Sequence, residues 1–289
     1  MNNNTLKVLE ALQLSTEFLE KKGIESARTN AELLLAEIIG CNRLGLYLAF
    51  ERPLNEDEKK TYREFIARRG KFEPLQYIIG NVEFYGLKFN VNENVLIPRP
   101  ETEILVEKIL ELVNKGNHLS ILDIGSGSGN ISIALAKNID SCSVTGLDIS
   151  EDAVTVAAEN CKLNNVEEKV KFLVQDVFKI NNGTVQNKFD VIVSNPPYVA
   201  NNEYSTLQEE IVKYEPKIAL TDFSDGFNFY KEIIRKSGDL LNSGGYLFFE
   251  AALGQSDKIA GLMKEANFTN VNVVKDYSNI DRIIYGQLK

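Results

Sequence analysis

The chain has 289 residues, of which 44% are hydrophobic and 25% are charged, and its formal net charge is -9. This length favours two domains, and the acidic balance disfavours a large electrostatic footprint for duplex nucleic acid. Three widely spaced cysteines without a C-x-x-C pair indicate neither a disulfide framework nor a zinc site, and no signal peptide or membrane span is expected.

The first quarter of the chain is predicted to be helical. From about Leu6 to Arg69 the apolar residues recur at helical spacing. Two stretches, "CNRLGLYL" and "ERPLNEDE", look like breaks between helices. We therefore expect a small all-α domain over residues 1–75.

A β-hairpin linker is expected over residues 76–100. In "YIIGNVEFYGLKFNVNENVLIPRPET", Gly80 and Gly86 punctuate alternating apolar residues, a pattern typical of a hairpin. The stiff "IPRP" then closes the linker, because each proline fixes a backbone angle.

Residues 101–289 are predicted to form an α/β domain. Five strand-like segments, "LSILDIG", "SVTGLDI", "VKFLVQD", "FDVIVSN" and "GGYLFFE", alternate with helical patterns. This rhythm indicates a mostly parallel sheet with helices on both faces. Near the end, "NVNVVKD" and "DRIIYGQL" leave little room for a crossover helix, so they are expected to pair antiparallel at the sheet edge.

A glycine loop follows the first strand of this domain. Gly125, Gly127 and Gly129 lie in the predicted turn between that strand and its helix, where bare backbone and free helix N–H groups can receive a ligand. The pattern is G-x-G-x-G, because Asn130 stands where the dinucleotide fingerprint requires Gly or Ala. A tight turn without a ligand is the alternative.

Two carboxylates end the next two strands. Asp148 lies where a carboxylate can accept both hydroxyls of a ribose, and Asp176 could accept from an adenine exocyclic amine. A helix N-cap is the alternative role for Asp148, although Ser150 is the better cap candidate. Together with the glycine loop, these residues predict a ligand that contains adenosine.

The stretch "FDVIVSNPPYVA" ends a buried strand with an amide and two prolines. Pro196 and Pro197 remove two backbone donors and fix two φ angles, which leaves carbonyl oxygens without competing N–H groups. Asn195 and this stiff segment are therefore suited to accept hydrogen bonds. The alternative is a turn that only terminates strand pairing.

The glycine loop, the two carboxylates and the Asn195–Tyr198 tetrapeptide resemble class I S-adenosylmethionine-dependent methyltransferases that act on planar nitrogens. The chain further resembles, nearly end to end, the peptide chain release factor N5-glutamine methyltransferases of the HemK/PrmC type. That resemblance is carried by "RRGKFEPLQYIIG", "EFYG", "LIPRPETE", "YEPKIAL", "DGFNFYKEII" and "GGYLFFE". DNA adenine or cytosine amino-methyltransferases share the tetrapeptide and are the alternative, which the acidic balance disfavours.

The resemblance implies a Rossmann-like, mostly parallel seven-stranded sheet over residues 101–289, preceded by a helical substrate-docking domain. The implied cofactor is S-adenosyl-L-methionine, converted to S-adenosyl-L-homocysteine, with no metal. The implied partners are class I release factors, whose GGQ glutamine accepts the methyl group in translation termination. Neither stable nucleic acid nor a membrane is an expected partner. The enzyme is expected to be a monomer in the cytoplasm.

The resemblance also implies roles for individual residues. The substrate amide would donate to the Asn195 side-chain oxygen and the Pro196 carbonyl, with Tyr198 stacked on it. The catalytic residues are Asn195, Pro196 and Tyr198. The substrate-binding residues are the same three together with Pro197. The cofactor-binding residues are Gly125, Ser126, Gly127, Ser128, Gly129, Asp148, Asp176, Val177 and Asn195.

Several positions leave questions open. The family's E-I-G-x-x-Q reads Glu250-Ala-Ala-Leu-Gly-Gln255 here, and Val177 replaces a usual aromatic, so Phe178 or another side chain would cover the adenine. Arg99 and Glu101 either border the cleft or brace the linker with surface ion pairs. His118 is expected in a solvated loop.

Overall fold

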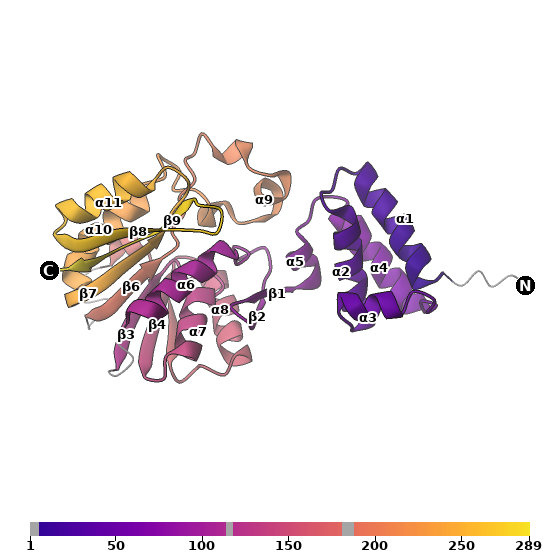
Figure 1. The fold of residues 1–289 in the computed structure, drawn as a ribbon, viewed down its shortest axis with the longest axis horizontal. Coiled ribbons are helices and arrows are strands. Elements are labelled where there is room, and N and C mark those ends of the chain that lie inside the picture. The colour runs from indigo at the N-terminus through magenta and orange to yellow at the C-terminus, as the bar shows by residue number, and fades with distance from the viewer. Residues whose placement is uncertain (1–5, 114–117, 181–187) are drawn as a thin grey trace, which may run out of the picture. The chain divides into compact units, whose positions relative to one another are not determined.

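Two units make up the fold of this computed structural model, which describes residues 6–113, 118–180 and 188–289 (Figure 1). The first unit comprises residues 1–80 together with 208–214, and the second comprises residues 81–207 and 215–289. Residues 1–5 of the predicted helical domain, residues 114–117 before His118 and residues 181–187 lie outside the described residues.

The first unit is helical. It contains α1 (Val8–Lys21), α2 (Ala27–Ile39), α3 (Arg43–Leu48), α4 (Glu56–Arg69), α5 (Leu75–Ile79) and the distant α9 (Glu209–Tyr214). Its core is built by apolar side chains from α1 to α5, among which Leu12, Leu34 and Leu35 are fully buried. Burial of each such side chain stabilises the fold by roughly 1.5–3 kcal/mol.

The prediction that "CNRLGLYL" is only a break was wrong, because it contains α3. Gly40 ends α2 in a left-handed conformation, and the side chain of Asn42 then caps α3 by accepting from Gly45 N at 2.8 Å. The second predicted break does separate two helices, since Asn55 caps α4 in a capping box with Glu58.

The predicted hairpin consists of β1 (Asn81–Phe84) and β2 (Leu87–Asn90), which pair antiparallel. Tyr85 and Gly86 form its turn with φ values of 51° and 70°, as a two-residue hairpin loop requires. Asn160 binds the backbone of Asn90 through both ends of its amide, at 2.7 and 3.0 Å. The hairpin is therefore attached to the second unit.

A seven-stranded sheet forms the centre of the second unit, in the order β5-β4-β3-β6-β7-β9-β8. The first five strands are parallel and β9 is antiparallel to both its neighbours, which confirms the predicted mostly parallel sheet and its antiparallel final pair. The strands are β3 (Leu119–Ile124), β4 (Cys142–Asp148), β5 (Val170–Val174), β6 (Phe189–Ser194), β7 (Leu241–Glu250), β8 (Phe268–Lys275) and β9 (Asp281–Leu288).

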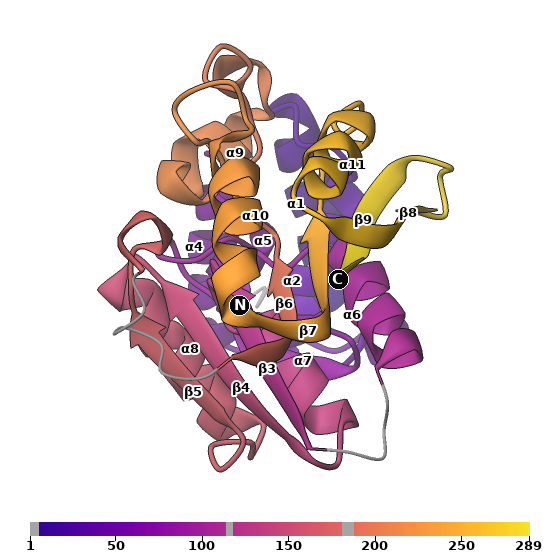
Figure 2. The same ribbon diagram turned by 90° about the vertical axis from the view of Figure 1, so that its left-hand side faces the viewer.

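Helices cover both faces of the sheet, as predicted (Figure 2). One face packs α6 (Glu101–Leu112), α7 (Asn130–Asn138) and α8 (Glu151–Leu163), and the other packs α10 (Asn228–Leu240) and α11 (Ser256–Glu265). From β3 the chain builds outward to β5 and then returns to β6 on the other side of β3. Such a switch point opens a crevice at the carboxyl ends of the strands, where ligands bind.

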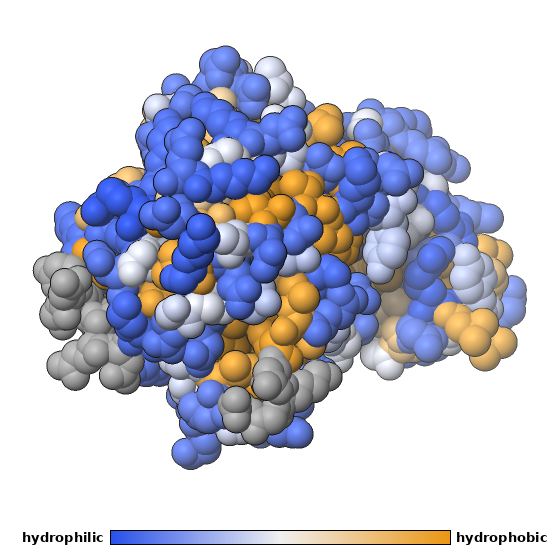
Figure 3. Space-filling view, turned by 60° about the vertical axis from the view of Figure 1, so that its left-hand side comes forward, coloured by the Kyte–Doolittle hydropathy of each residue, from blue (hydrophilic) through white to orange (hydrophobic). Residues whose placement is uncertain are grey.

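The face drawn in Figure 3 is mostly hydrophilic, with several hydrophobic areas. In the described part of the chain, no helix has the length and apolar character that crossing a bilayer requires.

Candidate active site

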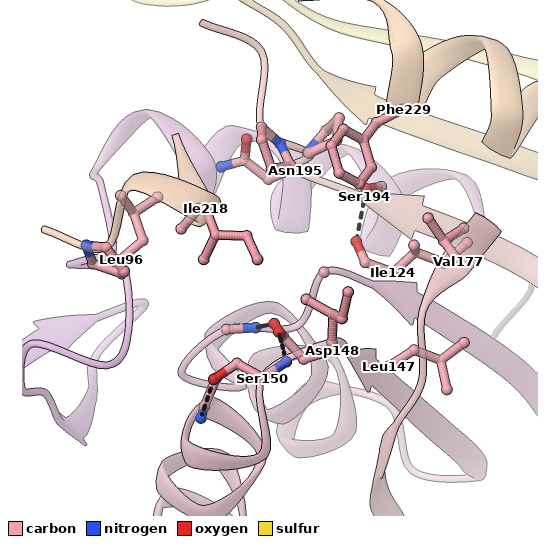
Figure 4. A pocket seen from close by; sticks show the side chains of 18 of the residues that line it. Leu96, Ile124, Leu147, Asp148, Ser150, Val177, Ser194, Asn195, Ile218 and Phe229 are labelled. Atoms are coloured by element: carbon pink, nitrogen blue, oxygen red, sulfur yellow. Dashed lines mark hydrogen bonds between the residues drawn. The ribbon is translucent and has the colours of Figure 1, made fainter. Parts of the chain in front are cut away.

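A cavity of about 210 Å³ lies at the carboxyl ends of β3, β4, β5 and β6 (Figure 4). Its remaining walls come from residues 94–96, from Pro216, Ile218 and Ala219, and from Phe229 at the start of α10. In Figure 4 Asn195 lies above the cavity and Asp148 below it. The crevice expected at the switch point of the sheet is therefore a formed pocket within the second unit.

The glycine loop presents bare backbone to this pocket. Gly125 and Gly127 line it with φ values of 77° and 52°, and a Cβ on either glycine would project into open space. Gly125 N and Ser126 N both donate to Leu147 O, at 2.8 and 2.9 Å. The loop is thus fixed to β4, and its open side can lie directly against a ligand.

Asp148 holds the loop from below. Its Oδ2 accepts from Gly127 N at 2.8 Å and its Oδ1 from Ser150 N at 3.0 Å (Figure 4). Burial raises the pKa of this carboxyl, while the backbone hydrogen bonds favour its charged form. The helix cap of α8 is Ser150, whose hydroxyl accepts from Ala153 N at 3.2 Å, so Asp148 is left facing the pocket.

Unpaired buried atoms lie in and beside the loop. Asp123 is fully buried, and its Oδ2 accepts from Ser132 N and Oγ at 3.2 and 2.6 Å. Among the described residues, Asp123 Oδ1 and Ser126 Oγ have no partner. Burial raises the pKa of Asp123 to about 7. Sequence reasoning did not assign Asp123 a site role, because burial of a strand carboxylate has no local signal.

The far wall of the pocket combines polar and aromatic groups. Asp176 accepts from Phe178 N at 2.9 Å and starts the short 3₁₀ helix η1 (Val177–Lys179). Val177 is buried in the lining, and the Phe178 ring meets Phe229 edge-on at 5.2 Å between centroids. The aromatic surface that Val177 lacks is thus available from Phe178 and Phe229, and sequence analysis assigned Phe229 no site role.

The tetrapeptide begins where β6 ends. Ser194 Oγ donates to Ile124 O at 2.7 Å, which fixes the end of β6 against β3. Asn195, Pro196 and Pro197 line the pocket. Tyr198 turns its side chain toward the core beneath α10, where burial raises its pKa to about 12. Its phenol is therefore neutral at physiological pH.

The structure brings most of the predicted site residues to one cavity. Gly125, Gly127, Asp148, Asp176, Val177, Asn195, Pro196 and Pro197 line it, whereas Ser126, Ser128, Gly129 and Tyr198 do not. Gly129 has a packing role, because a Cβ there would come within 2.8 Å of Phe172. His118 is exposed beside Ser141 and Ser143.

Arg99 brings together two segments that border the pocket. It pairs with Glu215, which is 1% exposed and also accepts from Ile97 N at 3.3 Å. This ion pair is buried on the carboxylate side and so differs from the surface brace considered from sequence. Such pairs fix geometry more than they add stability.

These groups fit S-adenosylmethionine. Bare backbone at the glycine loop and carboxylates at the ends of β4 and β5 suit a polar ligand with hydroxyl and amine donors. In the described ranges, no cluster of three or more His, Cys, Asp or Glu residues is arranged to hold a metal ion.

Comparisons with known proteins agree with this geometry. Residues 115–284 match the family described as "Methyltransferase domain", and residues 10–80 match the "PrmC N-terminal domain". A solved methyltransferase from Pyrococcus furiosus is similar in fold, with a TM-score of 0.52 and 19% identity over 81% of this chain and 98% of that one. Fold, pocket and family match together define a class I methyltransferase.

Curated relatives give a narrower assignment. The release factor glutamine methyltransferase of Fusobacterium nucleatum is 43% identical over 96% of this chain and 77% of the relative. Those of Geobacter sulfurreducens and Chlorobaculum tepidum are 38% and 40% identical, over 97% and 95% of this chain and 96% and 95% of the relatives. The chain belongs to the release factor glutamine methyltransferase family.

Proposed function

We propose that this chain transfers a methyl group from S-adenosylmethionine to the side-chain amide nitrogen of the glutamine in the GGQ motif of class I release factors. The family assignment supports the substrate class. The observation that carries the chemistry is the placement of Asn195 and Pro196 in the lining of the same pocket as the glycine loop and Asp148.

The tetrapeptide orients a poor nucleophile. An amide nitrogen is weakly nucleophilic because its lone pair is delocalised into the carbonyl. The Asn195 side-chain oxygen and the Pro196 carbonyl each accept one N–H of the substrate, so the lone pair points at the methyl carbon and the positive charge that develops on nitrogen is stabilised. This is catalysis by positioning and electrostatics.

The remaining pocket residues hold the cofactor, which supplies an electrophilic methyl carbon when bound. Asp148 accepts from ribose hydroxyls, Asp176 accepts from the adenine amine, and Phe178 and Phe229 border the base. Because the charged sulfonium already activates the methyl group, the reaction as proposed uses no metal. The phenol of Tyr198 is neutral, and its ring walls the tetrapeptide from water.

The first unit gives the substrate protein a second contact. We propose that the helical residues 1–75 dock a part of the release factor away from the GGQ loop, and that the hairpin region 76–100 links this domain to the catalytic residues 101–289. In this proposal the enzyme acts as a monomer in the cytoplasm and binds no nucleic acid stably. Exposed apolar side chains on α1 and α3, including Leu14, Leu44 and Leu48, are available for such docking.

A methyl-transfer experiment tests this function. The purified chain is incubated with a labelled methyl donor and a class I release factor, and separately with DNA, and the label is located by mass spectrometry. We expect one methyl on the GGQ glutamine and none when that glutamine is replaced by glutamate. Label on DNA bases and none on the release factor would establish the amino-methyltransferase alternative instead.

A further inference from the structure

Side chains from two other elements meet Asn195 on the protein side. Asn195 Nδ2 donates to the hydroxyl oxygen of Thr102, near the start of α6, at 3.3 Å. The carboxyl group of Glu250, the last residue of β7, is close enough to the side chains of Thr102 and Asn195 for both to lower its pKa. β6 and β7 run parallel with Ser194 opposite Phe249, so Asn195 and Glu250 follow in register. Thr102 and Glu250 are each 2% exposed.

These contacts distinguish the two ends of the Asn195 amide. The nitrogen end has two donors and the oxygen end has only acceptors. The nitrogen end donates to Thr102, and within the described ranges no donor to Asn195 Oδ1 is found. An ionised carboxylate can only accept, so it stabilises this one orientation of the amide.

We propose that Glu250 is a positioning residue that, directly and through Thr102, holds the Asn195 amide with Nδ2 toward the protein and Oδ1 free for the substrate. This inference rests on the proposed function and deepens it. When Glu250 is protonated, its O–H can donate to Asn195 Oδ1. The amide can then turn, and the substrate loses one of its two acceptors.

The surroundings of Glu250 allow this switch near neutral pH. Its Oε2 is buried without a partner among the described residues, and burial raises its pKa to about 7. Hydrogen bonding to Thr102 and Asn195 and the charge of Arg282 on β9 act in the opposite direction, while Glu101 on α6 raises the pKa further. Two phenols also lie nearby, those of Tyr198 and of Tyr230 on α10, and Tyr230 donates to the Glu250 carbonyl at 2.8 Å.

Kinetics with release factor as substrate give the first test. For the wild-type enzyme, kcat should rise with pH through about 7. Glu250→Gln should lower kcat about tenfold or more, with little change in KM, and should abolish the rising limb, because an amide does not titrate. Thr102→Ser keeps the hydroxyl and should retain activity, whereas Thr102→Val should lose it. A Glu250→Gln enzyme with wild-type kcat and an unchanged pH profile would overturn the inference.

A second test does not depend on turnover. The side-chain amide signals of Asn195 are observed by NMR in protein labelled with ¹⁵N-asparagine and assigned with Asn195→Ala. They should shift with a midpoint near neutral pH in the wild type and stay constant in Glu250→Gln. If they do not titrate in the wild type, the inference fails even if the enzyme is active. If no release factor is methylated but the signals titrate, the proposed function fails and the Glu250–Asn195 contact stands.

Discussion

Gln255 donates from its side-chain nitrogen to the carbonyl oxygen of Tyr198 at 3.0 Å. Its side-chain oxygen accepts from Ala252 N at 3.1 Å, so the amide is fixed at both ends. The end of the tetrapeptide is thereby tied to the start of α11. The altered E-A-A-L-G-Q stretch keeps its first and last residues, Glu250 and Gln255, and Gln255 is the one that hydrogen-bonds Tyr198.

Gly226 packs against the same carbonyl, and its replacement should displace the tetrapeptide. A Cβ at Gly226 would come within 2.4 Å of Tyr198 O, and the φ of 81° also disfavours alanine. We expect Gly226→Ala to lower kcat at least about tenfold and to cost roughly 1–3 kcal/mol of stability. Gly238→Ala is the matched control, because Gly238 lies in α10 with nothing within 4 Å of its Cβ position. It should keep full activity and gain about 0.5–1 kcal/mol. Full activity of Gly226→Ala in a kinetic assay would contradict this prediction.

Asn195→Ala should separate binding from chemistry. The substitution removes one of the two acceptors that orient the substrate nitrogen, so methyl transfer should become undetectable. Most cofactor contacts lie on β3, β4 and β5, so the Kd for S-adenosylmethionine measured by calorimetry should change by no more than a few-fold. Turnover by this variant at a measurable fraction of the wild-type rate would refute the orientation mechanism.

Asp148→Ala should weaken cofactor binding. The variant loses an acceptor for the ligand and the contact that holds Gly127 N at 2.8 Å. Loss of a charged hydrogen-bond partner costs about 1.5–3 kcal/mol, or roughly a 10- to 100-fold increase in Kd. Asp152→Ala removes an exposed carboxylate from the first turn of α8 and should bind normally. If the two variants bound S-adenosylmethionine with equal affinity, Asp148 would not be a cofactor-binding residue.

Buried carboxyls should make stability depend on pH. Asp123 and Glu250 both have a pKa raised to about 7 by burial, well above the values of about 4 in an unfolded chain. Folding therefore favours their protonated forms, and this contribution to stability is full below about pH 4 and is lost as pH rises to about 7. The Tm of the cofactor-free protein should therefore fall as the pH is raised from 5 to 7.5. Asp123→Asn should flatten this slope, and Asp140→Asn, at an exposed site, should leave it unchanged.

The sequence predicted those features that have a local pattern. Alternating strands and helices, the positive-φ glycines 125 and 127, and the proline pair after Asn195 each leave such a pattern, and the fold class follows from them. The role of Glu250 did not follow, because its relation to Thr102 and Asn195 arises from the packing of β7, α6 and β6, which are distant in the chain. The same holds for Phe229, which reaches the pocket from α10.

Two short helices were not predicted from the sequence for a different reason. α3 and α9 have six residues each, too few to show a helical repeat of apolar residues. α9 groups with the first unit although it lies more than a hundred residues after Gly80. Glu210 pairs with Arg69 at 2.7 Å, and the Tyr214 hydroxyl donates to Lys71 O at 3.0 Å.

This placement of α9 determines how the molecule can be dissected. The chain passes between the units after residues 80, 207 and 214, so no single cut separates them. A fragment that ends at residue 80 leaves the Arg69 guanidinium without its carboxylate, and a fragment that begins at residue 81 carries α9 without the helices that support it. A proteolytic nick at the hairpin would therefore leave the two pieces held together by the non-covalent contacts of α9 with Arg69 and Lys71.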